Sequence, residues 1–158
     1  MKKAEKTNVM RILERHKIPF KSYDYTDTEA ISGIDVANVL HENPEQVFKT
    51  LVTTGSSRNH YVFLVPVCRE LNLKKAAKAV QEKSMEMLKA KDLLPLTGYV
   101  HGGCSPIGMK KAFRTTIDIS AADFDTILFS GGKIGYQVEL SLDALKSVVD
   151  FDLTDICD

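Results

Sequence analysis

Two β-rich runs near the middle of the chain constrain its fold more than any other feature. Residues 47–54 and 60–67 are rich in β-branched and aromatic residues, which favour extended structure. Only residues 55–59, Gly-Ser-Ser-Arg-Asn, separate the two runs, and a short loop that contains glycine predicts a β-hairpin. The chain therefore contains an antiparallel strand pair against which its other elements have to pack.

Helix-like and extended segments are mixed along the rest of the chain without strict alternation. Apolar residues at helical spacing predict a helix over residues 5–16, which ends before Pro19. Four polar residues are expected to cap further helices at their N-termini: Ser32, Asn72, Ser84 and Ser141. Short strands are expected over residues 20–25, 115–119, 126–130 and 135–140. This mixture predicts an α+β fold with a mixed sheet.

The length and composition fit one domain that covers residues 1–158. Hydrophobic residues make up 44% of the chain and charged residues 27%, which is enough apolar material for one core. The N-terminal residues lack the apolar stretch of a signal peptide, and the longest apolar run, residues 61–67, is too short to cross a membrane. We therefore expect a cytoplasmic protein that does not bind membranes.

Cysteine and histidine residues indicate neither a disulfide framework nor a metal site. Cys68, Cys104 and Cys157 are widely spaced and form no Cys-x-x-Cys pair, as is usual in a reducing compartment. We expect no metal and no cofactor. His101 precedes Cys104 by three residues, which suggests a Cys–His nucleophile, but such a pair has to meet in space. An unreactive loop cysteine is the favoured interpretation.

The distribution of charge bears on whether the protein binds nucleic acid. The net charge is zero, whereas nucleic-acid-binding proteins are usually basic. Residues 69–91 nevertheless contain seven basic and three acidic residues, and residues 139–158 contain one basic and six acidic residues. Solvated helix faces explain such a distribution, and so does a basic face that attracts phosphates. Both interpretations stay open.

Lys49 is the first candidate for chemistry. In a strand it shares a face with Val47 and Leu51, because side chains alternate. A lysine is almost never fully buried without a partner, so its head either reaches water at a sheet edge or lines a cavity. A cavity lysine suits ester hydrolysis, because a fixed positive donor stabilises the negative charge that develops on the carbonyl oxygen.

Two glycine-rich segments are candidate binding loops. Residues 102–108 contain three glycines and Pro106, which permit positive φ angles and fix a bend. Backbone N–H groups of such a loop can bind a carbonyl or phosphate oxygen, although a structural turn explains the composition equally well. Residues 130–135 contain three glycines between two strands and predict a tight hairpin. In the functional alternative, Ser130 lies near a substrate.

Four segments, taken in order, resemble the YbaK/EbsC family of bacterial editing proteins, which is related to an inserted domain of prolyl-tRNA synthetase. They are residues 43–51, 73–78, 97–111 and 130–135. The resemblance implies an α+β domain in which helices flank a mixed, strongly curved, barrel-like sheet. It also implies hydrolysis of the ester that joins an amino acid to the 3′-terminal adenosine of a mischarged tRNA, with Cys-tRNA(Pro) as the foremost substrate.

The resemblance also implies roles for two parts of the sequence. Lys49 matches the family's essential lysine, which holds the substrate near its carbonyl and ribose. A Gly-x-x-x-Pro loop that positions the aminoacyl end is matched by Gly102, Gly103, Cys104, Ser105 and Pro106.

Further positions match residues that line the family's pocket, and two of them depart from its pattern. Tyr23, Ser130 and the turn of residues 135–137 fall at lining positions. Gln137 stands where some relatives have aspartate, and Ser32 stands where some have an aromatic wall residue. A pocket that selects by one methylene discriminates by only about 1–3 kcal/mol, so these departures bear directly on the amino-acid preference.

The mechanism proposed for this family needs no protein nucleophile, because the cysteine thiol of the substrate attacks its own ester carbonyl. Holding the two groups together can lower such a barrier by as much as ~7–11 kcal/mol. The candidate contacts to tRNA phosphates are Lys74, Lys75, Lys110, Lys111 and Lys133. A transient complex with prolyl-tRNA synthetase is expected, because so short a chain has no clear anticodon-reading element.

Three alternatives stay open at this point. The protein could deacylate Ala-tRNA(Pro) or another mischarged tRNA instead. It could be a Cys104–His101 thiol hydrolase that acts on a small ester. It could also be a module that binds aminoacyl-tRNA without turnover.

Overall fold

The predicted hairpin forms the centre of a five-stranded sheet. A computed structural model of the chain describes residues 6–158. Strands β2 (Phe48–Gly55) and β3 (His60–Pro66) are antiparallel, as predicted. Strand β3 pairs in parallel with β5 (Arg114–Asp118), and β5 pairs in parallel with β8 (Phe151–Thr154). The short β4 (Met85–Met87) completes the order β4-β2-β3-β5-β8.

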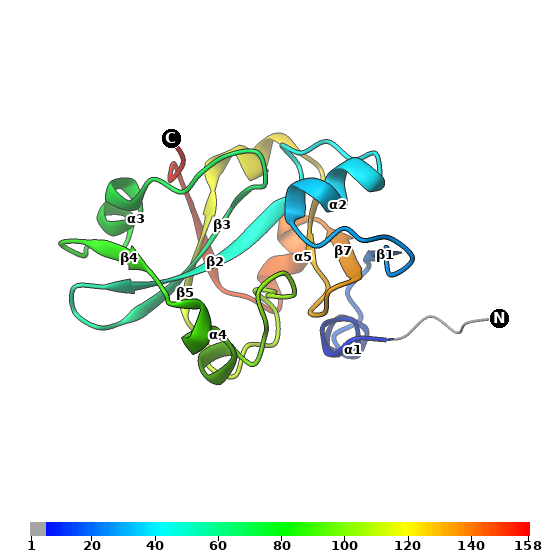
Figure 1. The fold of residues 1–158 in the computed structure, drawn as a ribbon, viewed down its shortest axis with the longest axis horizontal. Coiled ribbons are helices and arrows are strands. Elements are labelled where there is room, and N and C mark those ends of the chain that lie inside the picture. Colours follow the sequence, from blue (N-terminus) through cyan, green and yellow to red (C-terminus); the bar gives the residue numbers. More distant parts are fainter. Residues whose placement is uncertain (1–5) are drawn as a thin grey trace.

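A second, antiparallel sheet contains β1 (Lys21–Asp24), β7 (Tyr136–Leu140) and β6 (Ile127–Ser130), in the order β1-β7-β6. The turn that joins β6 to β7 is the predicted glycine hairpin. One parallel bridge, between Val47 and Leu128, connects this sheet to the start of β2. The expectation of one barrel-like sheet is not confirmed, because the strands divide between two sheets that are not closed into a barrel. The α+β class itself is confirmed (Figure 1).

Helices flank the sheets, and the starts of three of the helices in the described residues were predicted. The structure contains α1 (Asn8–Arg15), α2 (Gly33–Val39), α3 (Leu73–Ala79), α4 (Ala90–Thr97), the 3-10 helix η1 (Ile119–Asp123) and α5 (Leu142–Lys146). The first helix was predicted over residues 5–16; residue 5 lies outside the described residues, and α1 begins only at Asn8, after its N-cap Thr7. Ser32, Asn72 and Ser141 are confirmed as N-caps, because each side chain accepts a hydrogen bond from the backbone N–H three residues later.

The prediction that Ser84 caps a helix is wrong. The residues after it form β4, which pairs with the end of β2, and Met85 is buried beside Tyr61 and Phe63. Helix α4 begins only at Ala90, and Lys89 at its N-cap provides no side-chain hydrogen bond. Strands β4 and β8 and helix α4 were not predicted, because their formation depends on tertiary contacts rather than on local sequence signals.

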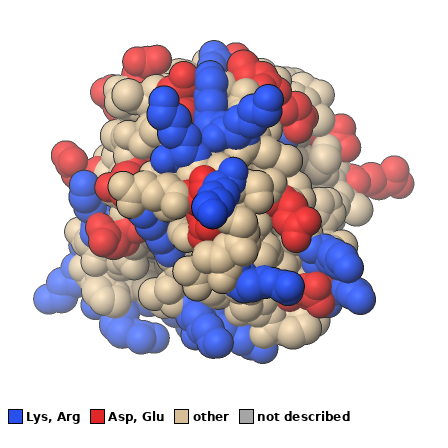
Figure 2. All heavy atoms as spheres, turned by 90° about the vertical axis from the view of Figure 1, so that its left-hand side faces the viewer, with Lys and Arg blue, Asp and Glu red and all other residues tan. Residues whose placement is uncertain are grey.

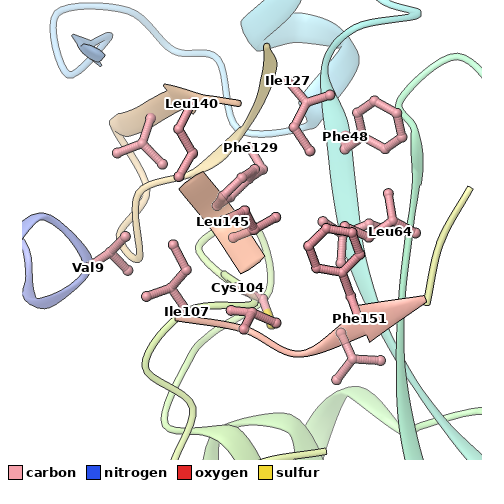
Figure 3. Packing of buried hydrophobic residues seen from close by; sticks show 14 of the residues in the cluster. Val9, Phe48, Leu64, Cys104, Ile107, Ile127, Phe129, Leu140, Leu145 and Phe151 are labelled. Atoms are coloured by element: carbon pink, nitrogen blue, oxygen red, sulfur yellow. The ribbon is translucent and has the colours of Figure 1, made fainter. Parts of the chain in front are cut away.

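The five-stranded sheet is covered on both faces. Val62 and Leu64 of β3 belong to the main core, which also contains residues of α1, α5 and both sheets. Figure 3 shows Leu145 of α5 among Phe129, Cys104 and Phe151 in that core. The alternate residues of β3, with α3 and the C-terminal segment, form a second cluster on the other face. This burial on both faces explains why residues 61–67 form an unbroken apolar run. Among the described residues, no helix is long and apolar enough to cross a membrane.

The main core yields a stability prediction. Leu145 is fully buried, so Leu145→Ala should lower the free energy of unfolding by about 2–5 kcal/mol. Leu94→Ala removes the same atoms from a side chain on α4 that is 50% exposed, and should cost less than about 1 kcal/mol. Urea unfolding of both variants tests this, and equal losses would contradict the assignment of the core.

Candidate active site

A pocket of about 210 Å³ lies where β2 separates from the second sheet. Its walls come from the start of α2, from residues 47–51, from the loop after α4 and from the β6–β7 turn region. Strand β4 pairs with β2 only over Thr53–Gly55, and β6 meets the chain at Val47. The segment between these two contacts therefore forms a pocket wall.

Lys49 lies in this wall, with its side chain 27% exposed. Its Nζ is 3.5 Å from Oε1 of Glu70, whose side chain is 80% exposed. An ion pair with so exposed a partner is weak, because water screens it and the flexible carboxylate is free to move away. The Lys49 ammonium can therefore exchange Glu70 for a negatively charged or carbonyl oxygen in the pocket.

The glycine-rich loop forms another wall of the pocket, and its backbone is tightly held. Gly102 has a φ angle of 87°, a conformation that side chains rarely adopt. A Cβ at this position would lie 3.0 Å from Cγ2 of Ile31. The turn is closed by the N–H of Gly103, which donates to the Val100 carbonyl at 3.0 Å, and by the Tyr99 hydroxyl, which donates to the Ile107 carbonyl. The loop is thus a rigid surface that a ligand can approach closely.

The pocket brings together six of the ten residues proposed from the sequence for the catalytic and substrate-binding site. These are Ser32, Lys49, Gly102, Cys104, Ser130 and Gln137. Gly103, Ser105 and Pro106 are buried in the same loop but do not line the pocket. Tyr23 does not line the pocket either. Its hydroxyl instead donates to Oε1 of Glu139 at 2.5 Å. That hydrogen bond, together with burial and the charges of Glu139 and Glu42, raises the pKa of Tyr23 to about 12.

The lysines proposed for tRNA phosphates are distributed over different parts of the surface. Lys74 lies in a shallow hollow beside α3, together with Lys78 and Lys83. Figure 2 shows lysine and arginine side chains on this side of the molecule, interspersed with acidic side chains. Lys75 instead pairs with Asp155 at 3.0 Å and donates to the Cys157 carbonyl at 2.7 Å. The side chain of Lys110 packs beside Gly98.

The sequence interpretation missed several lining residues, of which Thr50 is the most informative. It follows Lys49 directly and lines the pocket, yet its Oγ1 is buried with no hydrogen-bond partner among the described residues. Alternation along β2 does not predict this, because neighbouring residues of a strand normally face opposite sides. The others missed include Tyr25 and Ile31, whereas Tyr136 lies in the turn that the resemblance assigned to the pocket.

Cys104 lines the pocket but is not arranged as a nucleophile. Burial raises the pKa of its thiol to about 12, whereas a nucleophilic cysteine requires a stabilised thiolate. Cys104 belongs to the main apolar core, and Figure 3 shows it near Ile107 and Leu145; His101 lines the same pocket. The site thus offers a cationic side chain and a rigid glycine loop, and its one cysteine stays protonated.

Comparison with known proteins identifies the family to which this site belongs. Residues 28–148 match the model of the aminoacyl-tRNA editing domain, and the chain belongs to that family. It is 44% identical over 156 residues to EbsC of Enterococcus faecalis, covering 98% of this chain and 95% of that protein. EbsC is named as a Cys-tRNA(Pro)/Cys-tRNA(Cys) deacylase. The resemblance inferred from the sequence is thereby confirmed.

Solved structures share the fold at lower sequence identity. A protein called a trans-editing enzyme for prolyl-tRNA synthetase superposes with a TM-score of 0.78 at 19% identity, over 95% of this chain and 92% of that one. The hypothetical protein APE2540 gives a TM-score of 0.86 at 17% identity, over 95% and 99% of the two chains. At these identities the structures support the fold alone.

The environments of the three cysteines yield a prediction. Cys68 is exposed, whereas Cys104 and Cys157 are buried, and burial is the main cause that raises the pKa of both buried thiols to about 12. Iodoacetamide at mildly alkaline pH should therefore label only Cys68 in the folded protein, and all three cysteines in urea. Mass spectrometry of the peptides measures this. Labelling of Cys104 in the folded protein at the rate of Cys68 would restore the thiol-hydrolase alternative.

Proposed function

We propose that the protein is a trans-editing hydrolase that removes cysteine from mischarged tRNA, with Cys-tRNA(Pro) as its main substrate. The observation that carries the proposal is the placement of Lys49 and the Gly102 loop in walls of one pocket, in a chain of the aminoacyl-tRNA editing family. The name of the relative EbsC supports the choice of cysteine. The whole chain acts as one domain, in the cytoplasm.

In the proposed reaction the thiol of the bound cysteine attacks its own ester carbonyl. The sulfur–carbon bond forms as the ester carbon–oxygen bond breaks, the thiol proton passes to the departing ribose oxygen, and water opens the resulting thiolactone. Lys49 stabilises the negative charge on the carbonyl oxygen, and the loop at Gly102 holds the acyl group near the thiol. The buried, protonated Cys104 supports this mechanism, because it leaves the substrate to supply the nucleophile.

The pocket dimensions suit a small amino acid. Its volume of about 210 Å³ is below the ~300–1,000 Å³ of pockets that hold drug-sized ligands, and Ser32 places a small side chain in its wall. Cysteine and alanine differ by one sulfur atom, and their separation therefore depends on chemistry more than on size. A thiol-dependent reaction provides that separation, because alanine has no nucleophile.

Lys49→Ala should reduce the release of cysteine from Cys-tRNA(Pro) at least about 100-fold, the scale seen when a transition-state donor is removed. Lys146→Ala is the matched control, because Lys146 is an exposed lysine on α5 and its loss changes the net charge equally. Cys104→Ala should retain the activity. Release of labelled amino acid from Cys-tRNA(Pro) and Ala-tRNA(Pro) measures these effects.

Three outcomes of that assay would change the proposal. Release of alanine rather than cysteine would keep the reaction and replace the substrate. Loss of activity in Cys104→Ala alone would favour a protein nucleophile. Binding of both tRNAs without release would favour a module without turnover.

We propose that tRNA is held mainly through its phosphates. Lys74, Lys78 and Lys83 line the hollow beside α3 together with Glu82, and Lys110, Lys111 and Lys133 are further candidates. Contacts to phosphates carry no sequence information. A transient complex with prolyl-tRNA synthetase would therefore have to provide the selection of tRNA(Pro).

This proposal predicts weak tRNA discrimination by the isolated protein. Cys-tRNA(Pro) and Cys-tRNA(Cys) should be deacylated with kcat/KM values within about tenfold of each other, because backbone contacts do not distinguish them. Adding prolyl-tRNA synthetase should raise the ratio in favour of tRNA(Pro). Strong discrimination without the synthetase would contradict the need for a partner.

A further inference from the structure

The end of α2 places a carboxylate behind the pocket in a fixed position. His41 adopts a φ angle of 55°, its N–H donates to the Asn38 carbonyl, and the N–H of Glu42 donates to the Ala37 carbonyl at 2.9 Å. This is the Schellman arrangement that ends a helix. The next residue, Asn43, closes a turn by accepting from the N–H of Glu45 at 3.0 Å. The backbone of Glu42 is thus fixed on both sides.

The Glu42 side chain contacts Gln137, which lines the pocket from β7. Nε2 of Gln137 donates to Oε1 of Glu42 at 2.9 Å. The opposite orientation of the amide would place two oxygens together, so the ionised Glu42 determines which end of the Gln137 amide faces it. Gln137 is 2% exposed and lies on the central strand of its sheet, so its amide has little freedom to turn elsewhere.

Buried side-chain oxygens at this contact and in the β2 wall of the pocket have no hydrogen-bond partner in the part of the chain that the structure describes. Gln137 Oε1, Glu42 Oε2 and Thr50 Oγ1 have no hydrogen-bond partner among the described residues. Buried polar groups are normally paired, and a buried acceptor without a donor costs stability. Gln137 and Thr50 both line the pocket, where a bound molecule can provide the missing donors.

The charge near these oxygens indicates the kind of donor. Glu42 carries a carboxylate, and the pKa of Glu42 is raised by its burial and by the nearby charge of Glu139, although the hydrogen bond from Gln137 opposes the shift. Two acidic groups thus lie behind the wall that contains Gln137, whereas Lys49 belongs to the wall formed by β2. An aminoacyl ester has a matching polarity, because its α-ammonium group is a cation with three N–H donors and its carbonyl and phosphate ends attract a lysine.

We infer that Glu42 is a positioning residue for the α-ammonium group of the substrate: it orients the Gln137 amide so that Oε1 accepts from the ammonium, and it adds a negative charge behind it. The inference rests on the proposed function for the identity of the substrate. It places the carboxylate in the turn that follows α2 rather than on β7, where Gln137 stands. Glu42 acts through Gln137 and has no contact with the reacting atoms.

The test compares two esters of tRNA that differ only in this group. One is the cysteinyl ester, and the other has a hydroxyl in place of the α-ammonium and keeps the thiol. The wild-type protein should prefer the cysteinyl ester, and Glu42→Gln should lose about tenfold or more of that preference through a higher KM, with kcat little changed. Glu29→Gln, at an exposed acidic residue, should retain the wild-type preference.

An exchange of the two side chains separates positioning from mere folding. The double variant Glu42→Gln with Gln137→Glu keeps one carboxylate and one amide in contact and moves the charge onto β7. It should recover most of the preference for the ammonium ester. Equal losses of activity toward both esters in Glu42→Gln, with no recovery in the double variant, would show a structural role and overturn the inference. Thermal unfolding of each variant monitors folding.

A binding measurement keeps this result separate from the proposed function. Calorimetry would use adenosine that carries cysteine through a 3′-amide, which cannot be hydrolysed as an ester, and its α-hydroxy counterpart. If the wild-type protein hydrolyses neither ester, the proposed function fails. The inference then still stands if binding prefers the ammonium compound and Glu42→Gln removes that preference. Equal binding of the two compounds by the wild-type protein would overturn it.

Discussion

The junction between the two sheets determines the position of the site. At residues 46–47 the chain is held from both sides: the N–H of Leu128 donates to the Gln46 carbonyl at 3.1 Å, and the N–H of Val67 donates to the Val47 carbonyl at 2.8 Å. The Gln46 side chain adds a hydrogen bond to the Thr126 carbonyl at 2.8 Å. Beyond this point β2 follows β3, and its side chains line the pocket. A closed sheet would have filled that space with strand pairs, so the incomplete junction is what leaves room for a substrate.

Local chemistry explains the parts of this molecule that were predictable from sequence. The caps at Ser32, Asn72 and Ser141 and the hairpin around residues 55–59 depend on residues within a few positions of one another. For Lys49, strand alternation and the cost of burying an ammonium left a sheet edge and a cavity open, and the resemblance assigned it to the pocket. The division into two sheets depends instead on the contact between Val47 and Leu128, which are far apart in the sequence.

Glu42 shows why part of the site escaped prediction. In the sequence it is an acidic residue before Asn43-Pro44, with no pattern that distinguishes it from a solvated charge. Its connection to the pocket depends on the hydrogen bond from Gln137, which is 95 positions away in the chain. Tyr23 is the converse case, because the resemblance placed it in the pocket whereas its hydroxyl binds Glu139. Contacts between distant segments thus decide which polar residues reach a ligand.

Protonation of the two carboxylates behind the pocket has opposite effects on the stability of the fold. Burial opposes the ionisation of Glu139, but hydrogen bonds from Thr126 and Tyr23 and the charge of Lys21 outweigh it, so the pKa of Glu139 lies below its usual range. Ionised Glu139 therefore stabilises the fold above the pKa of an unfolded glutamate, and this stabilisation is lost only as the pH falls through its lowered value. The pKa of Glu42 is raised, so its contribution to stability has the opposite sign. Ionisation of Glu42 destabilises the fold, and protonation restores that stability. Acidification thus neutralises Glu42 while Glu139 still joins β1 to β7, and the charge that faces the substrate changes before the sheet that positions it.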